Sequence, residues 1–175
     1  MRLTTGGRAE RFATFYAACY GAVYAYGLRR VGPDAADEIA AETFLVAWRR
    51  FDELPTEPLP WLYGVARNIV LRHRRKTGRR LQTLEALARE PVATREVADD
   101  HDFGLWVAWD KLRDGDREVL ALIAWEELSV AEAAQVLGCP ASVFSVRLHR
   151  ARRRLERLLS ADAADPDPSH ILSEA

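Results

Sequence analysis

Arginines recur at helical spacing near the end of the printed sequence. Four of them are separated by three, four and three residues and would line one face of a helix: Arg147, Arg150, Arg154 and Arg157. An apolar set recurs at four, three, four and three and would line another face: Phe144, Leu148, Ala151, Leu155 and Leu158. Guanidinium groups match phosphate oxygens and guanine edges with paired hydrogen bonds. The spacing therefore predicts a helix that packs on one side and binds a polyanion on the other; a solvated arginine face is the alternative.

The residues before this helix have the signals of a helix-turn-helix unit. Ser129 and Glu132 form an S-x-x-E capping box, which predicts a helix over 130–137. Gly138 supplies a left-handed stop, and Pro140 restarts the chain. The second helix of such a unit fits the major groove of DNA, with its first turns at base edges and its later arginines at phosphates. The predicted DNA contacts are Ser142, Ser145, Val146, Arg147, His149, Arg150, Arg153 and Arg154.

A second basic segment lies in the first half of the chain. Seven basic residues and no acidic one fall within 64–80, next to Trp61 and Tyr63. Aromatic rings beside cations are the mixture that binds unstacked bases and their backbone. The candidate contacts are Trp61, Arg67, Asn68, Arg72, Arg74 and Arg75. Core packing of Trp61 and a solvated basic helix end are the alternatives.

The 175 residues carry a net charge of only -1, with 25 basic and 26 acidic side chains, but these charges are segregated along the chain. Apolar residues make up 49%, and no apolar run approaches the roughly 20 residues of a membrane span. The first ten residues lack the apolar core of a secretory signal, so we expect a cytoplasmic protein without membrane insertion. Cys19 and Cys139 are isolated and predict buried, unreactive thiols.

No set of residues suits catalysis or metal binding. The acidic residues at 34–42 begin a predicted helix, where carboxylates commonly favour the positive end of the helix dipole. The four histidines lack a metal-ligand spacing, and neither a phosphate-binding glycine loop nor a nucleophile motif occurs. We therefore expect no enzyme, no catalytic residue, no metal and no cofactor. An exposed acidic and aromatic helix is better suited to a basic protein partner.

The periodicity predicts an all-α protein, because apolar residues recur at three and four and strand-like alternation is nearly absent. We expect a first helix over 11–30 and a second that begins with Asp34 as its N-cap. Three prolines predict an irregular loop over 54–60, after which Trp61 would open a third helix.

Two small helical domains are expected, the C-terminal one a helix-turn-helix, joined by a flexible acidic linker. The linker is assigned where the sequence becomes acidic, poor in apolar residues and interrupted by Pro91. The predicted divisions are a first domain over 8–80, the linker over 81–102, a second domain over 103–160 and a disordered tail over 161–175.

Several motifs occur in a characteristic order. DAADEIAAETFLVAWR at 34–49 and PWLYGVARN at 60–68 lie in the first half. DREVL at 116–120, LSVAEAA at 128–134 and RLHRAR at 147–152 lie in the second half. Over about residues 10–159 the chain thereby resembles the extracytoplasmic-function, or group-four, sigma factors of bacterial RNA polymerase.

The resemblance implies a factor that binds the clamp and flap regions of core RNA polymerase, reads the minus-35 promoter element and opens promoter DNA at the minus-10 element. The positions that match the clamp-binding helix are Asp37, Glu38, Glu42, Phe44 and Trp48. The 54–60 loop, Trp61, Arg67 and Asn68 match the part that captures the melted strand. Ser145, Val146, His149 and Arg150 match the positions facing the upstream element, although the family often has a basic residue and a serine where this chain has Ser145-Val146. An anti-sigma factor is a further candidate partner.

Two other classes of protein compete with this interpretation. A conventional helix-turn-helix regulator, not bound to core polymerase, would explain the basic segment at 141–160 but not the one at 64–80. A nuclease would need a clustered set of metal ligands, which the sequence lacks.

Overall fold

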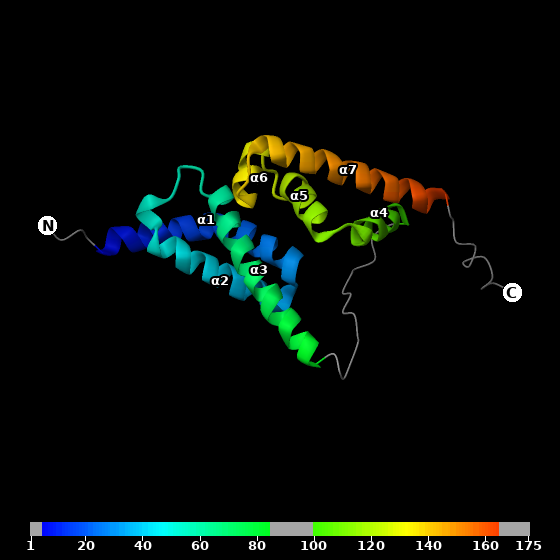
Figure 1. Cartoon of the computed structure of the whole chain (residues 1–175). Helices are drawn as coiled ribbons and strands as arrows, with labels where there is room; N and C mark the ends of the chain where they lie inside the picture. Colours follow the sequence, from blue (N-terminus) through cyan, green and yellow to red (C-terminus); the bar gives the residue numbers. More distant parts are fainter. Residues whose placement is uncertain (1–4, 85–99, 165–175) are drawn as a thin grey trace. The chain divides into compact units, whose positions relative to one another are not determined.

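A computed structural model of the protein describes residues 5–84 and 100–164, with side chains over 7–78 and 104–161 (Figure 1). All regular elements in this part of the chain are helices, which confirms the predicted all-α class. They are α1 (Thr5–Val31), α2 (Pro33–Arg49), the 3-10 helix η1 (Phe51–Glu53), α3 (Leu59–Leu84), α4 (Asp100–Lys111), α5 (Asp114–Ala124), α6 (Val130–Leu137) and α7 (Ala141–Ala164). Most of the predicted linker and most of the predicted tail, 85–99 and 165–175, lie outside the described residues.

The described helices divide into two compact units. The first unit contains α1, α2, η1 and α3 and also takes in most of α6, whereas the second contains α4, α5 and α7. The sequence predicts α6 as the first helix of a helix-turn-helix with α7, so the expected division over 8–80 and 103–160 stays a prediction.

The first unit is built on a close approach of α1 and α2, which α3 packs against. A Cβ at Gly27 would lie 3.4 Å from the Cβ of Ile39, at ordinary van der Waals distance, so the two helices pack closely at this point. Val23 and Tyr26, in the turn of α1 before Gly27, are fully buried. The Tyr26 ring stacks on Tyr63 of α3 at 5.2 Å, which ties the third helix to the first. The core therefore fixes the helices that carry the predicted sites.

The prediction that Asp34 caps the second helix is wrong. Gly32 is the N-cap residue, with φ of 79° and no side-chain hydrogen bond, and Pro33 is the first helical residue. Proline is favoured there because its fixed φ suits a helix and its missing N–H would have no intrahelical partner. Asp34 instead lies in the first turn, where its carboxylate faces the positive end of the helix.

The helices are also longer than predicted. α1 begins at Thr5 rather than near position 11, and α3 begins at Leu59 rather than Trp61, with Pro60 accommodated in the first turn. α3 then continues past Gly78 to Leu84. Glycine ends a helix when it adopts positive φ, and Gly78 does not, whereas Gly32 and Gly138 do.

The second unit holds α4 and α5 against α7 (Figure 1). Its core includes apolar side chains from the three helices and Leu112 between α4 and α5: Ala108, Leu112, Val119, Leu122, Phe144, Leu148 and Ala151. Trp125, after the end of α5, lies 4.6 Å from the ring of Trp109 and 6.3 Å from that of Trp106, both on α4. The apolar face predicted for α7 is therefore the face that packs.

The predicted stop at Gly138 is confirmed. Gly138 has φ of 64°, its N–H donates to the Gln135 carbonyl at 3.0 Å, and the Cys139 N–H donates to the Ala134 carbonyl at 3.0 Å. This is the Schellman arrangement, in which a left-handed glycine lets two terminal carbonyls of the helix find donors. The next helix starts at Ala141, and its Phe144 N–H donates to the Pro140 carbonyl at 3.0 Å.

Candidate nucleic-acid interface

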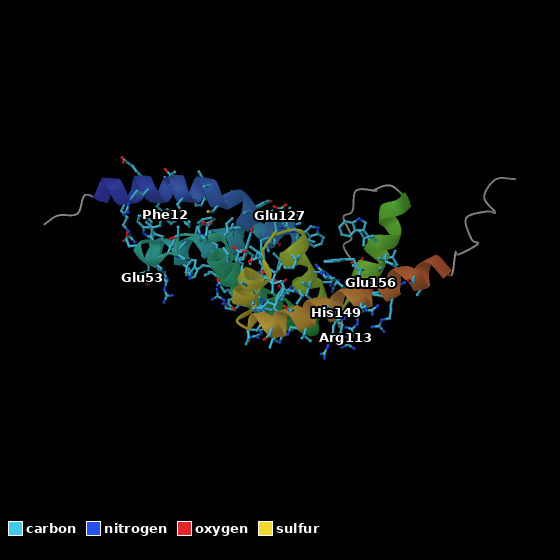
Figure 2. All side chains as sticks on the ribbon, turned by 90° about the horizontal axis from the view of Figure 1, so that it is seen from above. Phe12, Glu53, Arg113, Glu127, His149 and Glu156 are labelled. Atoms are coloured by element: carbon cyan, nitrogen blue, oxygen red, sulfur yellow. The ribbon has the colours of Figure 1, made fainter. Side chains whose placement is uncertain are left out.

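The outward face of α7 combines apolar and cationic side chains. Phe144, Leu148 and Ala151 are buried, and a helix turns about 100° per residue, so position 146 lies almost opposite this buried face. Val146 is accordingly 50% exposed. His149, labelled in Figure 2, follows three residues later and is exposed on the same side of the helix. Ser142, Arg150 and Arg153 are exposed as well. The structure therefore brings most of the predicted DNA contacts onto one surface.

Several polar groups on this surface already have partners within α7. The Ser145 hydroxyl donates to the Ala141 carbonyl at 3.0 Å, and Arg153 lies 3.9 Å from the Glu156 carboxylate. Within the described part of the chain, Arg147 and Arg150 are exposed and form no ion pair. Their guanidinium groups are available for a phosphate or a guanine edge.

Arg154 lies differently from the other predicted contacts. Its Nη1 donates to an Asp116 carboxylate oxygen in the first turn of α5, and the two side chains are only 34% and 21% exposed. The guanidinium therefore joins α7 to α5 instead of facing outward with Arg150. Sequence spacing placed the two arginines on one face, but the long Arg154 side chain bends toward the acidic start of the neighbouring helix.

The acidic residues at the start of α5, which include the partner of Arg154, are not among the sites predicted from the sequence. Asp114 and Asp116 lie in the first turn of α5, where Arg117 also pairs with Asp114 and lies 3.9 Å from Asp110 of α4. The DREVL motif at 116–120 was the available signal, but periodicity alone does not say which distant arginine an aspartate meets.

Two sets of residues share the predicted single-strand-binding segment of α3. Trp61, Asn68 and Arg72 are separated by seven and four residues and lie along one side of the helix, with Trp61 partly buried and the other two exposed. Arg75 continues this side and is exposed, whereas Arg67 is partly buried on a different side.

Two arginines of α3 are engaged with neighbouring helices. Arg72 Nη2 lies 2.7 Å from Glu42 Oε2 of α2. Arg74 Nη2 donates to the Arg30 carbonyl, near the end of α1, at 2.9 Å. A cation at a helix C-terminus satisfies a carbonyl that has no intrahelical donor. These two arginines thus help to hold α3 against α1 and α2, and they also add positive charge to the surface of α3.

The acidic side of α2 is also the side that faces solvent. Asp37 and Glu38 are exposed and Glu42 is partly exposed. The Tyr20 hydroxyl of α1 donates to Asp37 Oδ1 at 2.9 Å, and this bond to a carboxylate raises the pKa of Tyr20. Toward its C-terminal end the same helix exposes apolar side chains, Trp48 and Leu45, the latter 57% exposed. Leu45 is not among the contacts predicted from the sequence, although its position three residues before Trp48 is a signal for a shared helix face.

Phe44 does not share this exposure. It is 4% exposed and its ring lies 4.6 Å from that of Tyr16 and 6.0 Å from that of Phe15. In this structure Phe44 holds α2 against α1 rather than presenting a surface to a partner.

In the described part of the chain, no three histidine, cysteine, aspartate or glutamate side chains gather where they could hold a metal ion. Among the same residues, no helix is both long and apolar enough to cross a membrane.

Comparison with known proteins identifies both halves of the chain. Residues 15–80 match the family model of Sigma-70 region 2, and residues 105–155 match that of Sigma-70, region 4. The second match keeps α6 and α7 in one sequence module. Two helical modules of these types, in this order, define a transcription initiation factor of the sigma-70 class.

Individual relatives narrow this class. The chain is 31% identical over 136 residues to the ECF RNA polymerase sigma factor EcfG of Rhodopseudomonas palustris, a match that covers 75% of each chain. It is 31% identical over 161 residues to the RNA polymerase sigma factor CnrH of Cupriavidus metallidurans, with 82% of this chain and 84% of that one covered. Among solved structures, the sigma factor RpoE in complex with the anti-sigma factor NepR from Bartonella quintana has a TM-score of 0.69 at 26% identity, with 87% of this chain and 99% of that one covered.

The chain therefore belongs to the extracytoplasmic-function sigma factors of RNA polymerase. Its function is to direct the polymerase to promoters. The family matches confirm the family predicted from the sequence, and they disfavour the alternative of a conventional helix-turn-helix regulator. The family consists of transcription initiation factors, not of enzymes.

Proposed function

We propose that three separate surfaces of this sigma factor bind the three targets that promoter recognition requires. The outward face of α7 reads the minus-35 element, the exposed side of α3 with the 54–58 segment holds the melted minus-10 strand, and the exposed side of α2 binds core polymerase. The observation that carries the proposal is the outward face of α7, where Arg150 is exposed, forms no ion pair with any residue that the structure describes, and lies away from the buried apolar face.

The proposal for α3 rests on the chemistry that strand opening requires. Melting a base-pair step costs a few kcal/mol, so an initiation factor must offset that cost with contacts made only to the open strand. An aromatic ring stacks on an unpaired base, and cations follow its backbone. Trp61, Asn68 and Arg75 offer these groups along one side of α3, next to the irregular segment at 54–58.

The proposal for α2 rests on its mixed surface. Asp37 and Glu38 provide negative charge, and Leu45 and Trp48 provide exposed apolar area on the same side of the helix. An interface needs an apolar centre for affinity and charges around it for orientation. A basic, partly apolar surface of core polymerase would satisfy both.

We test the role of α7 with Arg150→Ala in transcription assays that contain core polymerase. If Arg150 contacts a guanine edge, the variant should lose about 1–3 kcal/mol of binding to the upstream element and should discriminate less at one base pair. Arg152→Ala is the matched control, because it removes the same charge from the same helix on a different side. Equal effects of the two variants would show that the proposed face is not the one that reads DNA.

A pull-down with core polymerase tests α2. Asp37→Lys and Leu45→Ala should each reduce capture of the polymerase, whereas Glu57→Lys changes an acidic residue outside α2 and serves as the control. Retention of full capture by both α2 variants would contradict the assignment.

An anti-sigma factor is a proposed regulatory partner, since solved relatives include RpoE with NepR and CnrH with the cytosolic domain of CnrY. Because DNA and polymerase are in the bacterial cytoplasm, we also place this protein there. Affinity purification of the tagged protein from its own host, compared between growing and stressed cells, tests the proposed partner.

A further inference from the structure

The recognition helix exposes two valines in its first turns. Val146 is 50% exposed and Val143 is 39% exposed, although the same helix buries Phe144 and Leu148. Residues three apart lie on neighbouring parts of a helix surface, so the two valines form a small apolar area. It lies where the helix is expected to meet base edges.

The groups around the valines are cationic. Arg147 and Arg150 flank them, are exposed, and form no ion pair among the described residues. The Ser145 hydroxyl points back to the Ala141 carbonyl at 3.0 Å, so its proton is already in use. The centre of the surface thus offers methyl groups without a free hydroxyl donor, flanked by two arginines.

The positive charge around the two valines limits which chemical group can bind against them. A partner that covers two valines between arginines must present a methyl group surrounded by negative charge. In the major groove of DNA, thymine presents a 5-methyl group, and the phosphates on both sides supply the charge. An apolar protein surface would instead leave the arginines without partners.

We propose that Val146, together with Val143, reads thymine 5-methyl groups in the upstream promoter element. The inference rests on the proposed function of α7 and adds the base that the element must contain. Three residues of a helix advance by about 4.5 Å, and stacked base pairs are about 3.4 Å apart, so the two valines match neighbouring base pairs. Val146 and Arg150 are one turn apart, which places an arginine contact beside the methyl contact.

The experiment uses the full-length protein assembled with core polymerase. An upstream element is first selected from duplexes with a randomised minus-35 region. Each thymine of the selected element is then replaced singly by deoxyuridine, which lacks only the 5-methyl group. We expect one or two positions at which this replacement weakens binding about fourfold, the value of one buried methyl-sized group.

The variants assign the effect to its residue. Val146→Ala should bind thymine and deoxyuridine equally at one of the sensitive positions, while Val146→Thr, which keeps one methyl group, should retain part of the difference. Leu105→Ala is the control, because it shortens another exposed apolar side chain, on α4, and should leave the difference unchanged. The valine is exposed, so its replacement should not unfold the helix.

The outcomes separate the two proposals. If no element is enriched, the proposed role of α7 fails and the inference fails with it. If an element is enriched and bound but every thymine can be replaced without loss, only the inference is overturned. A full methyl effect in Val146→Ala would also overturn it.

Discussion

Arg154 on α7 donates a hydrogen bond to the Asp116 carboxylate at the start of α5, and both side chains are largely shielded from solvent. The pair joins α7 to α5, the helix that packs against it. Arg150, one turn earlier, has no such partner among the described residues and is exposed. Two arginines on one helix therefore have different physical roles.

We expect Arg154→Ala to lower the free energy of unfolding by about 1–3 kcal/mol, because it leaves Asp116 partly buried without its cation. Urea unfolding of Arg154→Ala, Asp116→Ala and the double variant measures this loss and the coupling between the two residues. The double variant should be more stable than the sum of the single losses predicts. Simple additivity would show that the pair contributes nothing as a pair.

The salt dependence of DNA binding by Arg153→Ala and Arg154→Ala distinguishes an arginine that contacts DNA from one that stabilises the fold. Each phosphate contact contributes about 0.9 to the slope of log K against log salt concentration. Arg153→Ala should reduce that slope by about one contact, whereas Arg154→Ala should leave it unchanged. A reduced slope in Arg154→Ala would place this side chain on the DNA backbone instead.

Arg8 joins the first turns of α1 to the end of α2. Its Nη2 donates to the Trp48 carbonyl at 2.7 Å, its Nε lies 3.1 Å from Asp52 Oδ2, and its guanidinium lies 4.6 Å from the centre of the Trp48 ring. Phe12 lies one turn later in α1 and contacts the Trp48 ring edge-on at 4.8 Å (Figure 2). The N-terminal extension of α1, which the sequence did not predict, thus covers the C-terminal end of α2.

Arg8→Ala should therefore lower the free energy of unfolding by about 1 kcal/mol, since it removes a donor from a terminal carbonyl and a cation from an aromatic face. Hydrogen exchange should increase in the last turn of α2 and in η1. Arg49→Ala, which removes a charge from an exposed position at the end of α2, is the control. Unchanged exchange in Arg8→Ala would show that this contact does not hold the helix end.

The bond from Tyr20 to Asp37 predicts an alkaline dependence of stability. The hydrogen bond to the carboxylate raises the pKa of Tyr20 above its ordinary value near 10, because only the neutral phenol can donate. A raised pKa in the folded state means that the contribution is present below pH 10 and is lost as the pH rises through the folded-state pKa. Tyr20→Phe should lose this part of the dependence.

Thermal unfolding of the wild type and Tyr20→Phe between pH 8 and 11 measures this difference. Tyr24→Phe, which replaces a neighbouring tyrosine in α1, is the control. The same alkaline dependence in wild type and Tyr20→Phe would contradict the prediction.

Glu127 has a positive φ of 53° between α5 and α6. A side chain costs roughly 1–2 kcal/mol in this left-handed conformation, and glycine adopts it without that cost. Glu127→Gly should therefore raise the free energy of unfolding by up to about 1 kcal/mol, after the added flexibility of the unfolded chain is subtracted. Chemical denaturation measures the change, with Glu127→Ala as the control that removes the carboxylate but keeps the Cβ. A glycine variant no more stable than the alanine variant would contradict this explanation.

The two cysteines should differ in reactivity. Cys19 is buried in α1, and burial raises the pKa of its thiol, so little reactive thiolate forms near neutral pH. Cys139 is partly exposed. Alkylation followed by mass spectrometry should therefore label Cys139 first, with Cys19→Ala and Cys139→Ala confirming the assignment. Faster labelling of Cys19 would show that α1 opens readily.

Much of the fold could be predicted because helical periodicity and helix ends are local signals. The apolar spacing of Phe144, Leu148 and Ala151 identified the buried face of α7, and Gly138 was recognised as a stop from its place after an apolar run. The cap of α2 was assigned wrongly, because Asp34 and Pro33 both favour a helix start and the proline took the first helical position. When two adjacent residues both favour a helix start, small differences in backbone energy determine which of them becomes the first residue of the helix.

Spacing along single helices was enough to predict the all-α class, the family and the helix faces on which the candidate binding residues lie. The partners of those residues became known from the packing of the helices: Arg154 pairs with Asp116, Arg72 pairs with Glu42, and Phe44 packs against aromatic side chains of α1. A charge or a ring finds its partner on another helix, tens of residues away. That choice depends on how the helices pack, which no local pattern encodes.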